Sequence, residues 1–361
     1  MIEATTWASV LFLAVGPGKA MPPQDPCAAA QLNSELGGLP PPPAERGIAL
    51  GLFSLDPKWA GYTALVDEAK AHGATHLSVV WVWWQDHLKA TRIYAKPGWT
   101  ATEDQVLGTL RHAKRLGLHV TLFPILRLVS PNPGDWRGRI RPADEGAWWE
   151  SYDAFILRAA ALAAHTDTDR VSVGSELLTR EGMRERWRSL IERVRLRHSR
   201  LEIMYSANWD HFGPVRFWDL VDVAGVTAYF EVGPVRGAKL PALMEAWKAP
   251  HQQLLGFRTS LGRPLVVTEI GYPSLEGGLR WPWNETRRAR ADLEAQRLGY
   301  EAFARSFGSS LEGAYFWNWF GFGGKRDRNY TPRGKPAANV LACWFGLLTR
   351  TEARAEPRTS H

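Results

Sequence analysis

The sequence predicts an α/β fold, a single (β/α)8 TIM barrel with an N-terminal extension, on three observations. From residue 47 onward, short runs rich in β-branched and aromatic residues alternate with helical patterns, which is typical of βαβ units and a parallel sheet. Eight such runs lie within about 300 residues, a length that suits a closed barrel. No Gly-x-Gly-x-x-Gly fingerprint follows the first run, so an open dinucleotide-binding sheet is not favoured.

The predicted strands and helices follow one another almost strictly. The strands are Gly47–Phe53, His76–Trp83, His119–Leu126, Arg170–Ser175, Glu202–Ala207, Val221–Ala228, Pro264–Glu269 and Gly313–Trp319. The helices lie near 58–72, 103–117, 144–165, 180–198, 241–261, 286–307 and 336–348, with a shorter connection after the fifth strand. Thr102, followed by two acidic residues, suits a helix start, and Gly73 and Gly117 suit helix ends. Catalytic groups on such a barrel come from the carboxyl ends of the strands.

The ends of the chain differ from the barrel in composition. We predict a signal-like segment and Pro/Ala-rich linker over 1–46, the barrel over 47–349 and a polar tail over 350–361. The apolar stretch from Thr6 to Val15 resembles the core of a secretory signal, although Glu3 stands where basic residues are usual. A secreted or periplasmic protein is the expectation and a cytoplasmic one the alternative. No stretch approaches about 20 apolar residues, so no membrane span is expected.

Composition narrows the possible partners. With 45% hydrophobic and 22% charged residues, the chain suits a globular protein with a substantial core. The net charge of +7 comes mostly from arginines mixed with acidic residues on predicted helices, so we expect a solvated surface and no nucleic-acid partner. We also expect a monomer. Two cysteines are too few for a zinc site or a disulfide framework. Cys27 and Cys343 either form one bridge or remain free buried thiols.

The chain contains 18 tryptophans, many near predicted strand ends. An indole can stack on the apolar face of a sugar ring and also hydrogen-bond its hydroxyls, so this excess suits a glycan-binding cleft. The competing interpretation, given equal weight for any single tryptophan, is that the large side chains fill the core.

Two predicted strands, the fourth and the seventh, close on a glutamate, Glu176 and Glu269. By strand alternation, Glu176 shares its face with Ser172 and Gly174, small residues that suit the barrel interior. Hydrolysis of a glycosidic bond with retention needs one carboxyl group as acid and a second, about 5 Å away, as nucleophile. Either glutamate could instead be a salt-bridge partner of an arginine, but the pair beside Trp-rich loops favours catalysis.

These residues match a known pattern. The chain resembles the clan of retaining glycoside hydrolases built on (β/α)8 barrels, and within it family 113, known for β-mannanases. The likeness spans roughly 47–349 and is carried by an ordered series of short motifs: Trp136-Arg-Gly138-Arg-Ile140, Trp149-Glu-Ser-Tyr152, Gly174-Ser-Glu176-Leu177, Asn208-Trp209, Thr268-Glu-Ile-Gly-Tyr-Pro273, Phe316-Trp-Asn-Trp319 and Gly334-Lys-Pro336.

The resemblance implies a retaining glycoside hydrolase that cleaves a β-linked glycan, most similar to a β-mannanase, by double displacement and without a cofactor. Glu176 is then the general acid/base and Glu269 the nucleophile, so Glu176 must hold a proton near neutral pH while Glu269 is ionised. Ser175 stands where the clan usually has the asparagine that binds the sugar 2-hydroxyl. The shorter hydroxyl weakens that contact or makes it through water.

Further residues are candidates for substrate binding. By the resemblance, Tyr229 hydrogen-bonds the nucleophile and Trp317 forms the floor beneath the sugar. Polar groups at the same end of the barrel are Asn208 and Arg127, the latter alternatively a structural ion-pair partner. Candidates for flanking subsites are Trp81, Trp83 and Trp136, of which at most two are expected to touch substrate.

Two rival functions would need residues other than those found. A non-catalytic glycan-binding barrel would have no need to keep both glutamates. A barrel enzyme acting on phosphorylated or metal-bound substrates would need a phosphate loop or a metal cluster. His87, His211 and the other histidines lack metal-ligand spacing, so no metal is expected. The Gly-rich run 321–325 is the only hint of a phosphate loop, and we interpret it as a flexible loop over the cleft.

Overall fold

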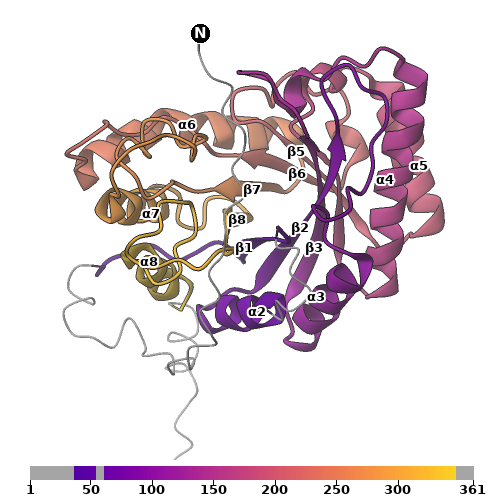
Figure 1. Cartoon of the computed structure of the whole chain (residues 1–361). Helices are drawn as coiled ribbons and strands as arrows, with labels where there is room; N and C mark the ends of the chain where they lie inside the picture. The colour runs from indigo at the N-terminus through magenta and orange to yellow at the C-terminus, as the bar shows by residue number, and fades with distance from the viewer. Residues whose placement is uncertain (1–35, 54–60, 347–361) are drawn as a thin grey trace, which may run out of the picture.

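The computed structural model describes residues 36–53 and 61–346 and confirms the predicted (β/α)8 barrel. Eight strands form a closed barrel in chain order with every pairing parallel, and helices surround it (Figure 1). The strands are β1 (Glu45–Gly51), β2 (His76–Gln85), β3 (His119–Leu128), β4 (Arg170–Ser175), β5 (Glu202–Ala207), β6 (Val223–Thr227), β7 (Leu265–Ile270) and β8 (Gly313–Phe316). Each predicted strand overlaps one of these.

The helices also follow the predicted order. They are α2 (Gly61–Ala71), α3 (Glu103–Arg115), α4 (Glu145–His165), α5 (Arg184–Arg197), α6 (Leu240–Leu261), α7 (Leu293–Phe307) and α8 (Pro336–Phe345), with short 3-10 turns η1 (Arg137–Arg139), η2 (Leu178–Arg180) and η3 (Trp218–Leu220). The largest difference is α7, which starts at Leu293 and not near residue 286. Asp292 caps it by accepting a hydrogen bond from the Ala295 amide, so the preceding segment is free to form a loop beside the cleft.

Some predictions for the chain ends fall outside the described residues: the signal-like stretch from Thr6 to Val15, Cys27 and the tail over 350–361. Cys343 is buried in α8, but the bridge to Cys27 stays a prediction. The last part of the predicted linker packs against the barrel, since Leu36 is buried and the Trp344 indole donates to the Pro40 carbonyl at 2.9 Å. Within the described residues, no helix is both long and apolar enough to cross a membrane.

Tryptophan fills much of the core between strands and helices. Seven indoles are completely buried there: Trp81, Trp148, Trp149, Trp187, Trp247, Trp319 and Trp344. A second, smaller apolar cluster lies inside the barrel and contains Val80, Val82, Trp84, Phe123, Ile125, Met204, Val223, Val266 and Tyr315. The core interpretation of tryptophan therefore holds for these seven, whereas Trp136, Trp209, Trp283 and Trp317 line a cleft.

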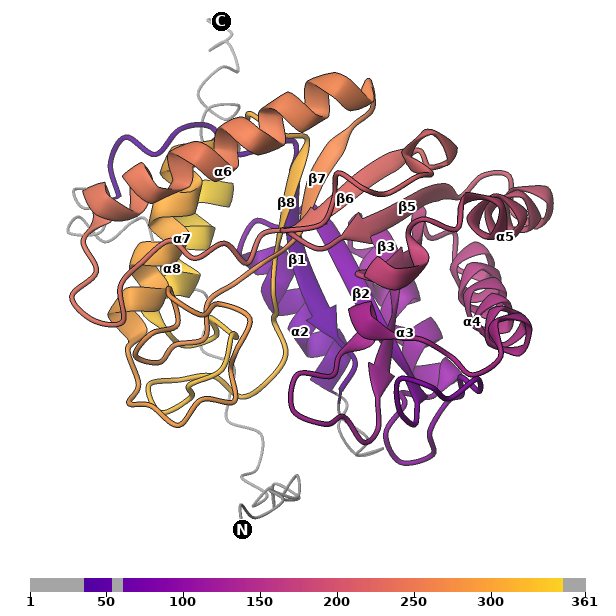
Figure 2. The ribbon, with the colours of Figure 1, turned by 90° about the horizontal axis from the view of Figure 1, so that it is seen from above.

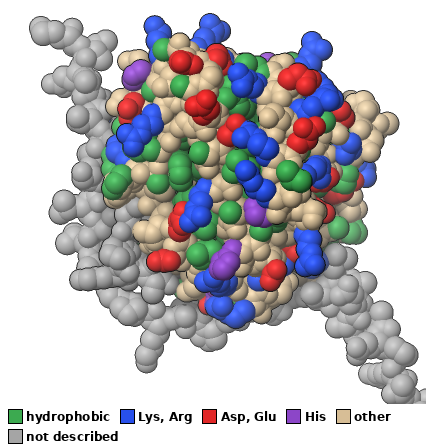
Figure 3. Space-filling model, turned by 90° about the vertical axis from the view of Figure 1, so that its right-hand side faces the viewer, with side chains coloured by type: hydrophobic (Ala, Val, Ile, Leu, Met, Phe, Trp, Pro, Cys, Tyr) green, Lys and Arg blue, Asp and Glu red, His purple; other side chains and the backbone are tan. Residues whose placement is uncertain are grey.

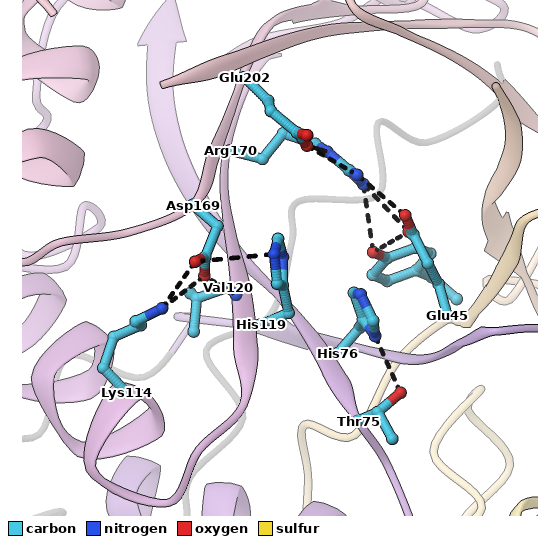
Figure 4. Close-up of polar contacts among 10 residues, drawn as sticks. Glu45, Thr75, His76, Lys114, His119, Val120, Asp169, Arg170 and Glu202 are labelled. Atoms are coloured by element: carbon cyan, nitrogen blue, oxygen red, sulfur yellow. Dashed lines mark hydrogen bonds and ion pairs between the residues drawn. The ribbon is translucent and has the colours of Figure 1, made fainter. Parts of the chain in front are cut away.

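A buried ion-pair cluster closes the amino-terminal end of the barrel interior (Figure 4). Arg170, the first residue of β4, donates to both carboxylate oxygens of Glu45 in β1, at 2.9 and 3.0 Å, and to Glu202 at 3.0 Å. The Tyr315 hydroxyl donates to Glu45 at 2.6 Å. Because β1 and β4 are not neighbours in the barrel, the Arg170–Glu45 pair connects separate strands across its interior.

The positive charge is dispersed on the one face of the molecule that Figure 3 shows. On the face covered by α4 and α5, lysine and arginine side chains alternate with acidic ones (Figure 3). Examples on these helices are the pairs Arg193–Asp153 and Arg188–Glu185. Such a mixed surface is typical of solvated helices and offers no continuous basic stripe for a nucleic acid on this face.

Candidate active site

A cleft of about 1160 Å³ opens at the carboxyl ends of the strands. The loops after β7 and β8 lie beside one another on one side of the opening, with those after β2 and β3 opposite (Figure 2). The Ser274 amide donates to the Asn329 carbonyl between the first two loops, and the Arg141 amide donates to the Leu88 carbonyl between the others. Both predicted catalytic residues, Glu176 and Glu269, line this cleft.

Glu269, near the end of β7, is the more enclosed carboxylate. It is 4% exposed, and its Oε2 accepts a hydrogen bond of 2.9 Å from the Tyr229 hydroxyl. Its other oxygen, Oε1, is buried and has no hydrogen-bond partner among the described residues. Burial and the negative charge of Glu176 raise the pKa of Glu269 to about 8, against the opposing effects of the Arg137 charge and the Tyr229 hydrogen bond.

Glu176 follows β4 directly and is held by an arginine. The guanidinium of Arg137, in η1, donates from Nη2 to Glu176 Oε2 at 2.6 Å and from Nε to the Ser175 carbonyl at 3.1 Å. The Glu176 amide donates to the Ser206 carbonyl at 2.8 Å. The short charge-assisted hydrogen bond from Arg137 fixes the Glu176 carboxylate beside a positive charge at the wall of the cleft.

Irregular strand pairing aims both glutamates. The β4–β5 register shifts between Ser172 and Ser175, and the β7–β8 register shifts between Val267 and Ile270. A Cβ on Gly174 would meet Tyr152 and Trp187 of the outer core, so Gly174 does not share the inner face as simple alternation predicts. The shift and a left-handed φ of 53° at Glu176 direct its side chain to the cleft.

The free protein has one electrostatic arrangement that differs from the expectation. The Arg137 charge lies on Glu176, whereas Glu269, which has no cation on its side chain, has the raised pKa. Burial and the Glu176 charge thus disfavour the ionised form of Glu269, whereas the mechanism expected from the sequence needs this carboxylate ionised. Acid and nucleophile together need one proton and one negative charge between them.

Most of the predicted binding residues reach the cleft. Tyr229, Trp317, Asn208, Arg127 and Trp136 all line it. Trp317 lies near Phe53, with ring centroids 6.1 Å apart, and the Trp317–Asn318 peptide bond is cis.

Trp81, Trp83 and Ser175 do not line the cleft. Trp81 is 1% exposed, and its indole donates to the Ala101 carbonyl. Trp83 stacks on Phe155 of α4, with ring centroids 4.8 Å apart. Both therefore lie on the outer face of β2, whose inner face carries Val82 and Trp84. Ser175 is buried, and its hydroxyl has no hydrogen-bond partner among the described residues.

Several cleft residues could not be assigned from the sequence. Arg137 belongs to the Trp136–Ile140 motif, but nothing in its spacing shows that it meets Glu176. Trp209 and Trp283 stack at 5.9 Å with an interplanar angle of 16°, although 74 positions separate them. The hydroxyl of Tyr330, after β8, donates to the Pro282 carbonyl, and the ring centroids of Tyr330 and Tyr229 are 6.1 Å apart. Only the fold brings these loops together.

The described part of the chain contains no group of three or more His, Cys, Asp or Glu side chains that could hold a metal ion. His211 instead pairs with the buried Glu181 at 2.7 Å. In the Gly-rich run after β8, Gly321 and Phe322 line the cleft, and the carbonyl of Gly321 accepts a hydrogen bond from Arg333.

Comparison with known proteins places this geometry in context. The family model described as Glycoside Hydrolase Family 113 matches residues 51–332. The chain is similar to a β-mannanase of that family from Alicyclobacillus acidocaldarius, solved in complex with ManMIm, with a TM-score of 0.73 and 25% identity over 84% of this chain and 97% of that one.

Other solved structures share the fold alone. A family 113 β-1,4-mannanase has a TM-score of 0.73 and 22% identity over 84% of this chain and 99% of its own. A β-D-glucuronidase of Dictyoglomus thermophilum has a TM-score of 0.57 and 18% identity over 85% of this chain and 51% of its own. No curated protein matches the chain.

Proposed function

Since the chain belongs to Glycoside Hydrolase Family 113 and is a glycoside hydrolase, we propose that it cleaves β-mannan or a related β-linked glycan with retention of configuration. Glu269 is the nucleophile and Glu176 the general acid/base. The observation that carries the proposal is that two buried carboxylates, at the ends of β4 and β7, line one cleft and interact electrostatically. The substrate class is supported by the Alicyclobacillus relative, which is named a β-mannanase.

In the first step, Glu176 gives its proton to the glycosidic oxygen while a Glu269 carboxylate oxygen attacks the anomeric carbon. The bond to the leaving sugar breaks, and a glycosyl ester forms on Glu269. In the second step, Glu176 takes a proton from water, the water oxygen attacks the anomeric carbon, and the ester bond breaks. Glu269 is released as a carboxylate, and both groups regain their starting protonation.

The catalytic cycle needs an ionised Glu269 and a protonated Glu176, although burial and the Glu176 charge raise the pKa of Glu269 in the free protein. Substrate binding favours this state, because a glycosidic oxygen beside Glu176 accepts a hydrogen bond only from the protonated acid. Tyr229 donates to Glu269 Oε2 and stabilises the negative charge of its ionised form. Arg137 also donates to the Ser175 carbonyl, a contact that holds the segment of the acid in place.

The test is Glu269→Ala, assayed for reducing ends released from β-1,4-mannan, glucomannan, xylan and cellulose. We expect the wild type to act on mannan and the variant to lose at least a thousandfold in kcat, since the covalent route needs this carboxylate. Azide should restore turnover of an activated aryl mannoside and give the glycosyl azide of inverted configuration. Glu276→Ala, in the loop after β7 but outside the cleft, is the matched control and should keep full activity.

An active Glu269→Ala protein contradicts the assignment of the nucleophile. Inverted product from the wild type, followed by NMR during hydrolysis, contradicts retention. Release of reducing ends from xylan or cellulose but not from mannan contradicts the substrate class while leaving the mechanism intact.

A further inference from the structure

A side pocket of about 220 Å³ opens from the main cleft at the end of β2 and β3. Its walls are Phe53, Val82, Trp84 and Trp99, and its remaining lining residue is Arg127. Phe53, Val82 and Arg127 also line the main cleft, so the two spaces adjoin each other. Trp84 and Trp99 meet edge to face at 5.0 Å and form a rigid aromatic corner.

Arg127 brings an uncompensated positive charge to this pocket. Trp84 and Arg127 are paired across β2 and β3, and the guanidinium carbon lies 5.7 Å from the Trp84 ring centroid. The side chain is exposed to the cleft, and its guanidinium makes no hydrogen bond and no ion pair with any described residue. Most of the arginines of α4, α5 and α7, by contrast, pair with carboxylates, as Arg193 and Arg297 do.

The charges around the pocket favour an anion. None of its lining side chains is acidic. Lys96 adds a second positive charge at its rim, with Nζ 3.5 Å from the centroid of Trp99. Partial removal of water from Arg127 lowers its pKa, and repulsion by the Arg137 charge lowers it further, whereas attraction by Glu285 across the main cleft raises it. The guanidinium remains charged.

The chemistry of the pocket matches one kind of sugar. A guanidinium presents a planar fork of donors that fits both oxygens of a carboxylate, while indole faces fit the apolar face of a pyranose. A neutral sugar would leave the Arg127 charge without a counter-ion in a partly desolvated site. On the basis of the proposed function, we infer that the side pocket binds a hexuronosyl unit of the glycan, with its carboxylate on Arg127.

The experiment compares two ligands that differ only at C6, methyl β-D-mannopyranoside and methyl β-D-mannopyranosiduronate, by NMR titration of the full chain. We expect the uronate to bind at least tenfold more tightly, because a charge-assisted pair at a partly buried site contributes at least this factor. Arg127→Met, which keeps an unbranched apolar stem but removes the guanidinium, should abolish the preference. Arg111→Met removes the same charge from the exposed face of α3 and should leave the preference unchanged.

Equal binding of the two ligands by the wild type would overturn the inference, as would a preference that survives in Arg127→Met. Binding is measured without turnover, so the result is independent of the hydrolysis assay. A uronate preference in a protein that releases no reducing ends from mannan would overturn the proposed substrate and keep the pocket assignment. Mannan hydrolysis without a uronate preference would overturn the pocket assignment and keep the proposed substrate.

Discussion

Replacing Glu269 by glutamine should remove a pH dependence from the stability of the protein. The pKa of Glu269 is raised to about 8 from an ordinary value of 4.5. Between these values the unfolded chain has lost this proton and the folded protein keeps it, so the folded state binds more protons. The free energy of unfolding therefore falls as pH rises through this window, by about 1.4 kcal/mol per pH unit at most. Over about 3.5 units the upper limit is about 5 kcal/mol.

Because the neighbouring Glu176 charge is one cause of the raised pKa, we expect about 2–5 kcal/mol of this change to be observed. The amide of Glu269→Gln does not titrate, so the variant lacks the slope. Urea unfolding, followed by tryptophan fluorescence at several pH values from 5 to 9, measures it directly. The variant should gain stability relative to the wild type as pH rises and should stop gaining above about pH 8.

A matched control is Glu276→Gln, which makes the same chemical change in the loop after β7 but outside the cleft. Its stability relative to the wild type should show no comparable trend across this window. If the difference in unfolding free energy between the wild type and Glu269→Gln is the same at pH 5 and pH 9, the buried, raised pKa of Glu269 is refuted.

Two further substitutions test the two ends of the barrel. Tyr229→Phe removes the hydrogen bond that lowers the pKa of Glu269. We therefore expect kcat to fall about tenfold or more and the acidic limb of the pH–rate profile to move to higher pH. An unchanged acidic limb would contradict this role of Tyr229. Arg170→Met leaves the Glu45 carboxylate buried without its partner and should cost about 3–5 kcal/mol in unfolding free energy at pH 7. Arg170 lowers the pKa of Glu45 despite burial, so this loss should shrink as pH falls toward 4, and a loss independent of pH would contradict the ion pair.

The order of strands and helices was predictable because each element carries its own local signal. Strands with two buried faces read as continuous apolar runs, and Thr102 forms the capping box that its neighbours suggest. Because both faces of such a strand are apolar, the sequence does not show to which face each side chain points. In β2, which is apolar on both faces, hydrophobicity cannot distinguish Trp81 and Trp83 from Trp84. The sequence therefore indicated a tryptophan-rich cleft but selected two tryptophans of the wrong face.

The catalytic glutamates were predictable from their place at strand ends, but their surroundings were not. Both depend on shifts in strand register, which leave no recognisable residue pattern in a single sequence. The contact between Arg137 and Glu176 joins residues 39 positions apart, through a loop whose path follows from packing against β4. The Arg137 charge also lowers the pKa of Glu269 against the effect of burial, so the electrostatics of the pair could be worked out only once the loop was placed.

The left-handed backbone of Glu176 bears on whether the site is in use. Outside glycine, this conformation costs about 1–2 kcal/mol, and glycine or asparagine at this position would relieve most of it. Either replacement would also remove the contact with Arg137, but a barrel that only held glycans would have no need of a carboxylate in this conformation. Its presence in a strained conformation fits a lineage in which selection has acted on turnover and not on folding alone.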